Sequence, residues 1–527
     1  MKFIREHRVL FVIFLLALIL RVIFLEKAPV GFHADEVRIA WNSYSIAETG
    51  ADDWGNRFPL YYNTFGDFRP MGIFYTTIPS ILLFGLNIFA VRLPGALFGA
   101  LTVFPIYFFV KQLNKKDEVT ALFASFFIAF IPWHWMVSRA TSEGIISLFF
   151  TVCGLVFFLW GYSKGKHYFT WSVISMIVSA LFYHSIRPLS VPFLLTILVF
   201  QWMQRSTVPR RAVIAITALT CFTIVLLLGK GSLSRFSQVS VLAAKQTDEV
   251  LGAHTQIPSY PVLVRDSYTE YFSAPFIIGD DAKPFRYRIF GIGIVGVALT
   301  AFFLAGFVSI AKGHNSALPL WLLLIAPLSA AITFEDSPNL HRSLLMIPFV
   351  VIVAAYGARH LLTQSTTQKI IGLLILCYFC GTTTSSIITY FGPAKNDIAS
   401  FRNYGAQEVI QKIQTTGERY DHIVLTNQPD SLYPWYGFLA KPDARMFNSA
   451  AHTRAEGSWR YEHITFAQNS CPSADALSEK SDLRGNILVV DGPFCESSGI
   501  QIAHPTAKRS HIELDNTVFF TLWEMRK

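Results

Sequence analysis

The sequence predicts a multi-pass α-helical membrane protein that carries a small C-terminal soluble α/β domain. Hydrophobic residues make up 52% of the 527 residues, charged residues only 15%, and the mean hydropathy is +0.41, which is not the composition of an ordinary soluble protein. Apolar runs of about 17 to 25 residues, each able to cross a bilayer core of about 30 Å, recur as far as Gly392 and then stop. We therefore expect a transmembrane domain over residues 1–392 and a soluble domain over residues 393–527.

About eleven segments are long and apolar enough to span a bilayer as helices, which satisfy their own backbone hydrogen bonds in lipid. The predicted spans are residues 9–25, 93–110, 119–135, 144–160, 169–183, 188–202, 212–228, 289–310, 318–333, 343–362 and 370–391. The first segment could also be a cleaved signal peptide. Its full length and the lack of a small-residue cleavage site favour an uncleaved anchor.

Lysine and arginine crowd into every second connection, which predicts that those loops face the cytoplasm. They are Lys2, Arg5 and Arg8, then Lys111, Lys115 and Lys116, then Lys164 and Lys166, and then Arg205, Arg210 and Arg211. The N-terminus is then cytoplasmic, and an odd number of crossings places the C-terminal domain outside the plasma membrane. These topology signals also account for most of the net charge of +9, so that charge does not indicate nucleic-acid binding.

Two outer loops are too long to be simple connectors. In the first, residues 26–71, apolar side chains recur at helical spacing from Asp35 and end at Gly50, which predicts an amphipathic helix lying on the outer leaflet. Asp52 and Asp53 are expected in a solvated turn. The sequence MGIFYTTIPSILLFGL, at the end of this loop, predicts a re-entrant or interfacial helix. The second loop, residues 230–288, has the length of a lid or a binding element.

The sequence after residue 393 changes to the pattern of an α/β domain. QEVIQKIQ predicts a helix, HIVLTN and NILVVDG predict buried strands, and TVFFTLWEM predicts a last strand. Cys471 and Cys495 are the two cysteines of this domain. A pair on the outer side of a membrane suggests a disulfide, while two unpaired buried thiols remain the alternative.

Ionisable residues near the outer ends of the spans are the candidate functional residues, because such groups are costly to keep near lipid. They are Asp35, Glu36, Asp67, Arg69, Arg139, Glu143, His184, Arg187, Glu335, Asp336, His341 and Arg342. If the helices form a bundle, these loop ends converge on one outer cavity. Arginines there would bind a phosphate through two oxygens at once, and a carboxylate would take the proton of an attacking hydroxyl.

Several stretches resemble the integral-membrane glycosyltransferases of the GT-C fold, which include protein O-mannosyltransferases and lipid A aminoarabinose transferases. GFHADEVRIAWNSYSIAETGADDWGNRFPL is similar to the Asp-Glu outer loop of that family, and FGDFRPMGIFYTTIPSILLFGLNIFAVRLPGALFGALTVFPIYFF to the segment after it. YHSIRPLSVP and HRSLLMIPF are similar to later outer span ends. The resemblance implies a transfer of one sugar, a hexose or a pentose, from a polyprenyl-phosphate donor to a protein, lipid or cell-envelope glycan.

Residue by residue, the resemblance implies that Asp35 is the catalytic carboxylate and that Glu36 supports it or binds the acceptor. Arg69 stands where related chains often carry a lysine followed by two prolines, near the lipid phosphate, and RPMG keeps the cation and one proline. Further candidates for contact with the donor phosphate or sugar are Asp67, Arg139, Arg187, Arg342 and His184.

Each candidate also has a purely structural interpretation. Asp35 could be a helix N-cap, and Glu36 a first-turn charge stabilised by the helix dipole. Asp67 could pair with Arg69, and Arg139 with Glu143. Arg187 and Arg342 could be snorkelling residues at the interface, and His33, His184 and His341 could be structural histidines.

The proposed chemistry requires no cofactor, since arginines can neutralise a leaving lipid phosphate. Asp35, Glu36, Asp67 and His33 could bind a divalent cation, but their spacing is not that of a metal motif. Two other classes of function stay open. A transporter or flippase could use the same charged cavity for passage, although the sequence shows no repeated halves. A binding or assembly subunit could use the soluble domain to hold a partner.

Overall fold

The computed structural model describes residues 7–527 except 65–66, 115–116, 206, 241–258, 393–395, 428–430, 456, 479–480, 494 and 496–505. The chain forms two compact units. The helical unit contains Met1–Leu25, Tyr61–Ile73 and Arg92–Ala394, and the mixed unit contains Glu26–Leu60, Phe74–Val91 and Lys395–Lys527. The change of character near residue 393 is therefore a boundary between units, but much of the first outer loop folds with the C-terminal part of the chain.

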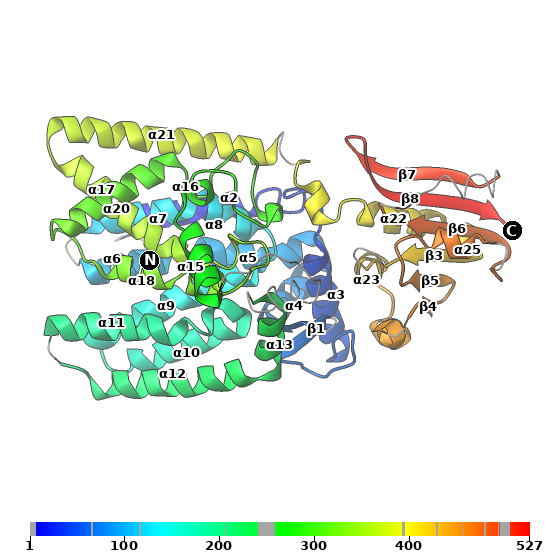
Figure 1. Cartoon of the computed structure of the whole chain (residues 1–527), viewed down its shortest axis with the longest axis horizontal. Coiled ribbons are helices and arrows are strands. Elements are labelled where there is room, and N and C mark those ends of the chain that lie inside the picture. Colours follow the sequence, from blue (N-terminus) through cyan, green and yellow to red (C-terminus); the bar gives the residue numbers. More distant parts are fainter. Residues whose placement is uncertain are drawn as a thin grey trace. The chain divides into compact units, whose positions relative to one another are not determined.

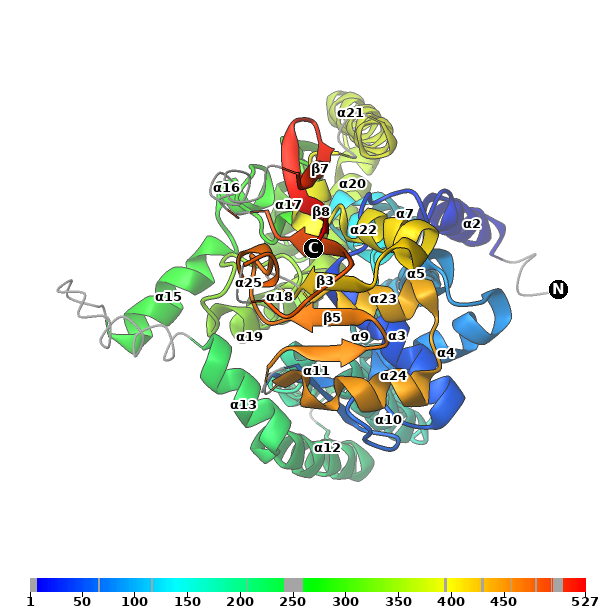
Figure 2. The ribbon, with the colours of Figure 1, turned by 90° about the vertical axis from the view of Figure 1, so that its right-hand side faces the viewer.

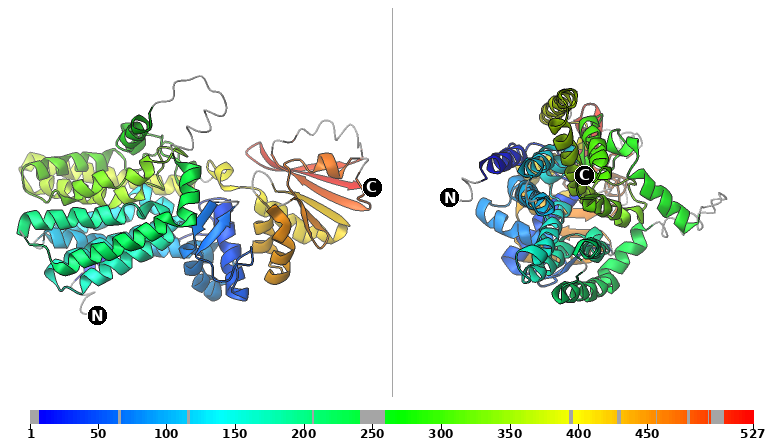
Figure 3. Two further views of the ribbon diagram at one scale, coloured as in Figure 1. Left: turned by 60° about the horizontal axis from the view of Figure 1, so that its bottom comes forward. Right: turned by 90° about the vertical axis from the view of Figure 1, so that its left-hand side faces the viewer.

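The helical unit is built from apolar helices, several of which lie nearly parallel (Figures 1 and 3). Its α-helices are α2 (Arg8–Val22), α5 (Ile88–Leu101), α6 (Val103–Leu113), α7 (Glu118–Phe130), α8 (Pro132–Arg139), α9 (Glu143–Ser163), α10 (Tyr168–Phe182), α11 (Ser190–Arg205), α12 (Arg210–Leu228), α13 (Lys230–Val239), α15 (Tyr260–Glu270), α16 (Ala274–Ile277), α17 (Val297–Ala311), α18 (Leu318–Ile325), α19 (Leu328–Ala331), α20 (Ile347–Thr363) and α21 (Thr366–Phe391). The 3₁₀ turns η1 (His184–Ile186), η2 (Phe285–Tyr287) and η3 (Leu344–Met346) and the hairpin β1 (Tyr61–Thr64) and β2 (Asp67–Pro70) complete it.

Each of the eleven predicted spans contains a helix. Within the described part of the chain, six helices are long and apolar enough to cross a membrane, or seven if the bent pair α7 and α8 is one span. Tyr168–Phe182, Val297–Ala311 and Leu318–Ala331 are shorter apolar helices. The prediction of a multi-pass helical membrane protein is thus confirmed.

Two predicted spans differ from the structure in detail. The span over 119–135 is broken: α7 and α8 meet at 49°, and Pro132 begins α8 because it cannot donate the hydrogen bond that would continue α7. The span over 289–310 was predicted too long. Its helix starts only at Val297, because the preceding sequence GIGIVG has a low helix propensity.

Small residues bring the apolar helices into close contact. A Cβ atom on Gly306 of α17 would collide with the carbonyl oxygen of Val353 in α20, and one on Gly357 with that of Phe302. Between α9 and α10, the Ser179 hydroxyl lies 2.8 Å from the hydroxyls of both Ser147 and Thr151. Close backbone approach and interhelical hydrogen bonds are the main stabilising contacts available between helices in lipid.

The mixed unit contains a six-stranded sheet in the order β4-β5-β3-β6-β8-β7 (Figure 2). The central strands β5, β3 and β6 are parallel, and β4, β8 and β7 are antiparallel to their neighbours. Its elements are α3 (Ala34–Thr49), α4 (Gly72–Phe84), η5 (Ala399–Arg402), α22 (Ala406–Thr416), η6 (Gly417–Arg419), β3 (His422–Thr426), α23 (Tyr433–Ala440), α24 (Ala444–Ala450), η7 (Ala451–Ala455), β4 (Trp459–Tyr461), β5 (Ile464–Ala467), α25 (Ser473–Ala476), β6 (Asn486–Asp491), β7 (Lys508–Leu514) and β8 (Thr517–Arg526). The predicted helix and three strands are all confirmed.

The prediction that the helix after Asp35 lies on the outer leaflet is wrong. In α3 the side chains of Val37, Ala40 and Trp41 are completely buried by protein. Trp41 packs against Gly437 of α23 and Phe447 of α24, and its indole N–H donates to Asn448 Oδ1 at 3.0 Å. The helix α3 is amphipathic because its apolar face belongs to the core of the mixed unit.

Cys471 and Cys495 form a disulfide, with Cα atoms 5.5 Å apart, which confirms the predicted pair. The thiols of Cys153, Cys221, Cys377 and Cys380 are free.

We expect alkylation of denatured, unreduced protein to label only those four cysteines, with the other two labelled after reduction. Cys471→Ser should lower the stability of the mixed unit by about 2–4 kcal/mol, because the bond closes a loop of 24 residues that is otherwise free in the unfolded chain. Cys221→Ser is the matched control, since Cys221 is exposed and unpaired. Mass spectrometry of the alkylated peptides checks the pairing, and six labelled thiols in unreduced protein would contradict it.

Candidate functional site

The N-terminus of α3 is closed by a capping box. His33 is the N-cap: its Nδ1 accepts from the Asp35 N–H at 3.1 Å, and Glu36 Oε2 accepts from the His33 N–H at 3.1 Å. The alternative that Asp35 is the N-cap is therefore wrong, because His33 already has the extended backbone of a cap (φ −60°, ψ 150°). Asp35 instead lies in the first helical turn, where the helix dipole stabilises a negative charge.

The two neighbouring carboxylates have different environments. The Asp35 side chain is 22% exposed, and its Oδ2 lies 3.5 Å from His33 Nδ1. The Glu36 side chain is only 3% exposed and forms an ion pair with Arg402. The Asp35 carboxylate is therefore accessible to a substrate, whereas the Glu36 carboxylate is held in the protein interior by its ion pair.

A turn from the C-terminal segment holds the residues on both sides of Asp35. The Arg402 guanidinium donates to Glu36 Oε2, and Asn403 Oδ1 accepts from the Ala34 N–H at 2.8 Å. Gly31, in the left-handed region at φ 78°, lies so close to this turn that a Cβ atom there would be 2.6 Å from the Arg402 carbonyl oxygen. Arg402 is itself fully buried.

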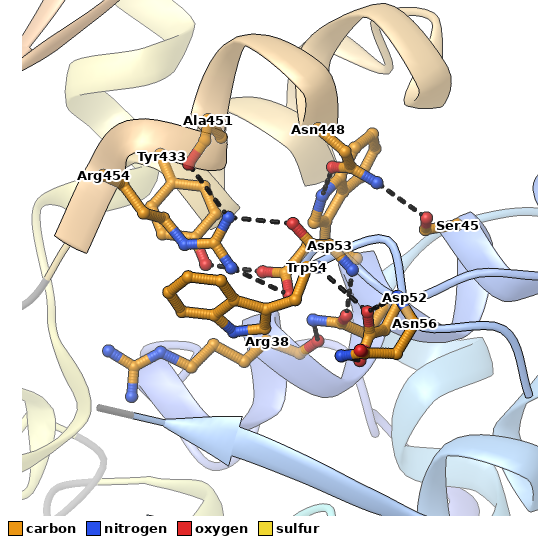
Figure 4. A network of polar contacts seen from close by, with 12 residues as sticks. Arg38, Ser45, Asp52, Asp53, Trp54, Asn56, Tyr433, Asn448, Ala451 and Arg454 are labelled. Carbon is orange, nitrogen blue, oxygen red and sulfur yellow. Dashed lines mark hydrogen bonds and ion pairs between the residues drawn. The ribbon is translucent and has the colours of Figure 1, made fainter. Parts of the chain in front are cut away.

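A second buried ion pair follows the other end of α3 (Figure 4). Arg454 Nη2 lies 3.1 Å from Asp53 Oδ1, and both side chains are at most 2% exposed. The Tyr433 hydroxyl donates to Asp53 Oδ2 at 2.5 Å, and the Arg454 guanidinium stacks 3.5 Å from the centre of the Trp54 ring. The prediction that Asp52 and Asp53 form a solvated turn is wrong, because C-terminal residues far along the chain cover them.

Asp52 organises the turn itself. Its Oδ1 accepts from the N–H groups of Trp54 and Asn56, and its Oδ2 accepts from the Asn56 amide at 3.1 Å. Burial raises the pKa of the Asp52 carboxyl above its ordinary value, and the charge of Asp53 adds to this, while the hydrogen bonds from Asn56 and Trp54 oppose it.

A pocket of about 190 Å³ lies in the mixed unit beside the start of α3. Gly31 and Phe32 line it from the loop before α3, and Asn403, Tyr404 and Glu408 line it from the C-terminal segment. The turn that holds the first residues of α3 thus also forms one wall of a pocket.

In the helical unit, three of the predicted residues meet around the hairpin. Arg69 lies in β2 opposite Tyr62, and the His184 ring lies 2.9 Å from the carbonyl oxygen of the neighbouring Phe68. Arg187 is 1% exposed, lies over the Tyr61 ring, and donates to Ser232 Oγ at 2.5 Å. The backbone of Asp67 pairs with Thr64, but its side chain lies outside the described part of the structure.

Arg342 lies before α20 and is 8% exposed. Its guanidinium donates to the carbonyl oxygen of Glu335 at 2.9 Å and forms an ion pair with the half-exposed Glu335 carboxylate. The neighbouring His341 has a ring nitrogen 2.9 Å from Ser142 Oγ and the other 3.0 Å from the Tyr183 hydroxyl. Since Tyr183 precedes His184, these contacts join the region of Arg342 to that of the hairpin.

Arg139 has a structural position at the end of α2. It is completely buried and donates to the carbonyl oxygens of Leu20 at 2.6 Å and Ile23 at 2.8 Å. Arg92, also buried, donates to the carbonyl oxygen of Leu25 at 3.0 Å. Cations at this position stabilise the negative end of a helix dipole.

Sequence reasoning missed several buried arginines, among them Arg21, Arg402 and Arg454. Arg21 has a visible signal, a cation inside an apolar span, and its Nη2 lies 2.8 Å from His134 Nδ1. Arg402 and Arg454 have no such signal, because their carboxylate partners precede them by several hundred residues. Among the described residues, no group of three or more histidine, cysteine, aspartate or glutamate side chains could hold a metal ion.

Residues 69–236, less than half of the chain, match the model of the dolichyl-phosphate-mannose-protein mannosyltransferase family. No curated protein sequence matches the chain. Among solved structures, ArnT from Cupriavidus metallidurans bound to undecaprenyl phosphate superposes with a TM-score of 0.60 at 11% identity, covering 98% of this chain and 97% of ArnT. The archaeal oligosaccharyltransferase AglB from Archaeoglobus fulgidus, in complex with an inhibitory peptide and a dolichol-phosphate, superposes with a TM-score of 0.52 at 14% identity, covering 92% and 70%. The predicted GT-C fold is thus confirmed.

The pair of Arg454 and Asp53 predicts a large stability effect. Arg454→Met should destabilise the mixed unit by about 3–5 kcal/mol, because it leaves the buried Asp53 carboxylate without its cation. The double variant with Asp53→Asn should regain part of that loss. Denaturant unfolding in detergent, followed by tryptophan fluorescence, measures both, and a double variant less stable than Arg454→Met would contradict the assignment.

The raised pKa of Asp52 predicts a pH dependence. An aspartate with a raised folded-state pKa binds its proton more tightly when folded, so its contribution favours folding below the unfolded pKa and declines as pH rises through the folded pKa. Asp52→Asn, which keeps an acceptor oxygen but does not titrate, should therefore gain stability relative to the parent protein as the pH rises above the ordinary pKa of aspartate. Thermal unfolding midpoints test this, with the exposed Asp266→Asn as the control.

Proposed function

We propose that this protein is an inverting glycosyltransferase that moves one sugar, a hexose or a pentose, from a polyprenyl-phosphate donor to an acceptor at the outer face of the membrane. The observation that carries the proposal is the environment of Asp35. It is a partly exposed carboxylate on a fixed helical turn, beside a second carboxylate that an arginine neutralises. The family match over residues 69–236 and the GT-C fold support the same class of reaction.

The reaction is a single displacement. Asp35 takes the proton of the acceptor hydroxyl as that oxygen attacks the anomeric carbon, and the bond between that carbon and the phosphate oxygen breaks. The polyprenyl phosphate leaves with the bonding electrons. One attack from the face opposite the leaving group inverts the anomeric centre, whereas retention by double displacement would require a second carboxylate that forms a covalent intermediate.

Cationic side chains balance the charge that develops on the leaving phosphate. We assign this role to Arg69 and Arg342, which are less deeply buried than the other two candidate arginines, because a guanidinium can hold two phosphate oxygens in one plane. Arg139 and Arg187 are at most 1% exposed and donate to protein oxygens, so we assign them to the framework. His184 supports the hairpin that carries Arg69. The proposed reaction requires no metal or other cofactor.

The structural neighbours support a polyprenyl-phosphate donor, because their solved complexes contain undecaprenyl phosphate or a dolichol-phosphate. We propose a polyprenyl phosphate for this chain, with its phosphate at the membrane surface. The acceptor is a hydroxyl of a protein, a lipid or a cell-envelope glycan. We propose a plasma-membrane location with the N-terminus in the cytoplasm, which the positively charged loops support, and the disulfide between Cys471 and Cys495 supports an outer location for the mixed unit.

Asp35→Asn should lower the rate of sugar transfer by at least about a hundredfold while leaving the fold intact, because the amide cannot accept the proton of the acceptor. The assay supplies purified protein with polyprenyl-phosphate sugars and acceptor extracts, and detects new glycosides by mass spectrometry. Size-exclusion elution and melting temperature control for folding. Undiminished transfer by Asp35→Asn would rule out Asp35 as the base.

The same assay separates an enzyme from a flippase. A flippase would move the intact donor across a vesicle bilayer and leave its glycosyl phosphate bond unbroken. Release of free polyprenyl phosphate together with a glycosylated acceptor supports the transferase, and movement of an intact donor without release supports the alternative.

A further inference from the structure

The turn made by η5 and Asn403 holds the start of α3 at three points. The Arg402 guanidinium pairs with Glu36, the Asn403 amide oxygen accepts from the Ala34 N–H, and the Arg402 backbone packs against Gly31. Ala34 and Glu36 are the two neighbours of Asp35 in the chain. The turn thus fixes the backbone on both sides of Asp35.

The residue types of the turn suit this task. Asn403 has φ 53° and ψ 42°, the left-handed conformation that asparagine tolerates better than most other residues with a side chain. In that conformation its side-chain oxygen reaches the Ala34 N–H, one of the first N–H groups of α3, which have no partner within the helix. Asn403 therefore supplies both the turn and an external partner for the helix start.

The buried ion pair between Arg402 and Glu36 also fixes the start of α3. Arg402 is completely buried and Glu36 is 2% exposed, so this interaction is shielded from water and screened little by salt. Glu36 also accepts from the His33 N–H in the capping box. Arg402 thus acts on the cap through Glu36, and the cap in turn fixes the Asp35 N–H.

We propose that Arg402 and Asn403 are positioning residues for Asp35, an inference that rests on the proposed function of Asp35 as the base. The C-terminal segment then completes the catalytic end of α3. A displacement of about 1 Å at a reacting group can cost about a hundredfold in rate, so a small shift of this turn is sufficient to change turnover.

The test compares two substitutions at one position. Asn403→Gly keeps the left-handed turn and removes the acceptor for the Ala34 N–H, whereas Asn403→Asp keeps both. Asn448→Ala is the control, because Asn448 holds Trp41 farther along the same helix. For each variant we would measure kcat and KM for the donor, together with hydrogen exchange of the amides of residues 34–38.

We expect Asn403→Gly to lower kcat about 10- to 100-fold, to change KM for the donor less than twofold, and to speed exchange at residues 34–38. Asn403→Asp should restore both properties, and Asn448→Ala should lower the melting temperature with kcat within twofold of the parent.

Unchanged exchange and kcat in Asn403→Gly, or equal losses in Asn403→Asp, would overturn the positioning role. If the parent protein transfers no sugar, the proposed function fails, and the exchange measurement then tests by itself whether Asn403 fixes the start of α3.

Discussion

Buried carboxylates near the start of the chain are neutralised by arginines near its end, and the mixed unit depends on this pairing. Glu36 and Asp53 are nearly inaccessible to water, and Arg402 and Arg454 are their partners. An isolated charge in such surroundings would cost several kcal/mol, so each part of the unit stabilises the structure of the other. The same pairing leaves Asp35, between two fixed neighbours, as the accessible carboxylate of the capped turn.

The helical unit also buries arginines, and there backbone carbonyl oxygens are their partners. Arg139 and Arg92 turn their charges toward backbone carbonyl oxygens at the end of α2, and Gly306 and Gly357 let α17 and α20 touch. Inside a membrane-spanning region there is no water to satisfy polar groups, so hydrogen bonds and close packing take over the role that burial of apolar surface has elsewhere.

The sequence predicts well what depends on local pattern. The helical spans, the buried strands around Val424 and Val489, and the pair of Cys471 and Cys495 follow from hydropathy, alternation and composition. The surroundings of α3 could not be predicted in this way. Its apolar stripe fits a membrane surface and a protein core equally well, and only the distant residues Gly437 and Phe447 decide between them.

The residues of the candidate site also divide into those that local sequence pattern predicts and those that depend on distant partners. Asp35 stands out because a carboxylate close to a span is conspicuous, and Arg69, Arg187 and His184 are found because they lie close to apolar segments on the predicted outer side. Arg402 and Arg454 lie among many charged residues of a soluble segment, and nothing local marks them as partners of Glu36 and Asp53. A long-range ion pair is a property of the fold, and one sequence by itself does not contain that information.

The discontinuous composition of the mixed unit also affects how the protein is made. Residues 26–60 emerge early in synthesis but pack with residues 395–527, which emerge last. At roughly 5–20 residues per second, the ribosome needs on the order of half a minute to deliver the missing part. During that interval Glu36 and Asp53 lack the arginines that pair with them in the folded mixed unit. A chain cut short before residue 402 would contain the apolar helices of the helical unit and yet lack both arginines, so correct folding of the mixed unit also reports that translation has passed this segment.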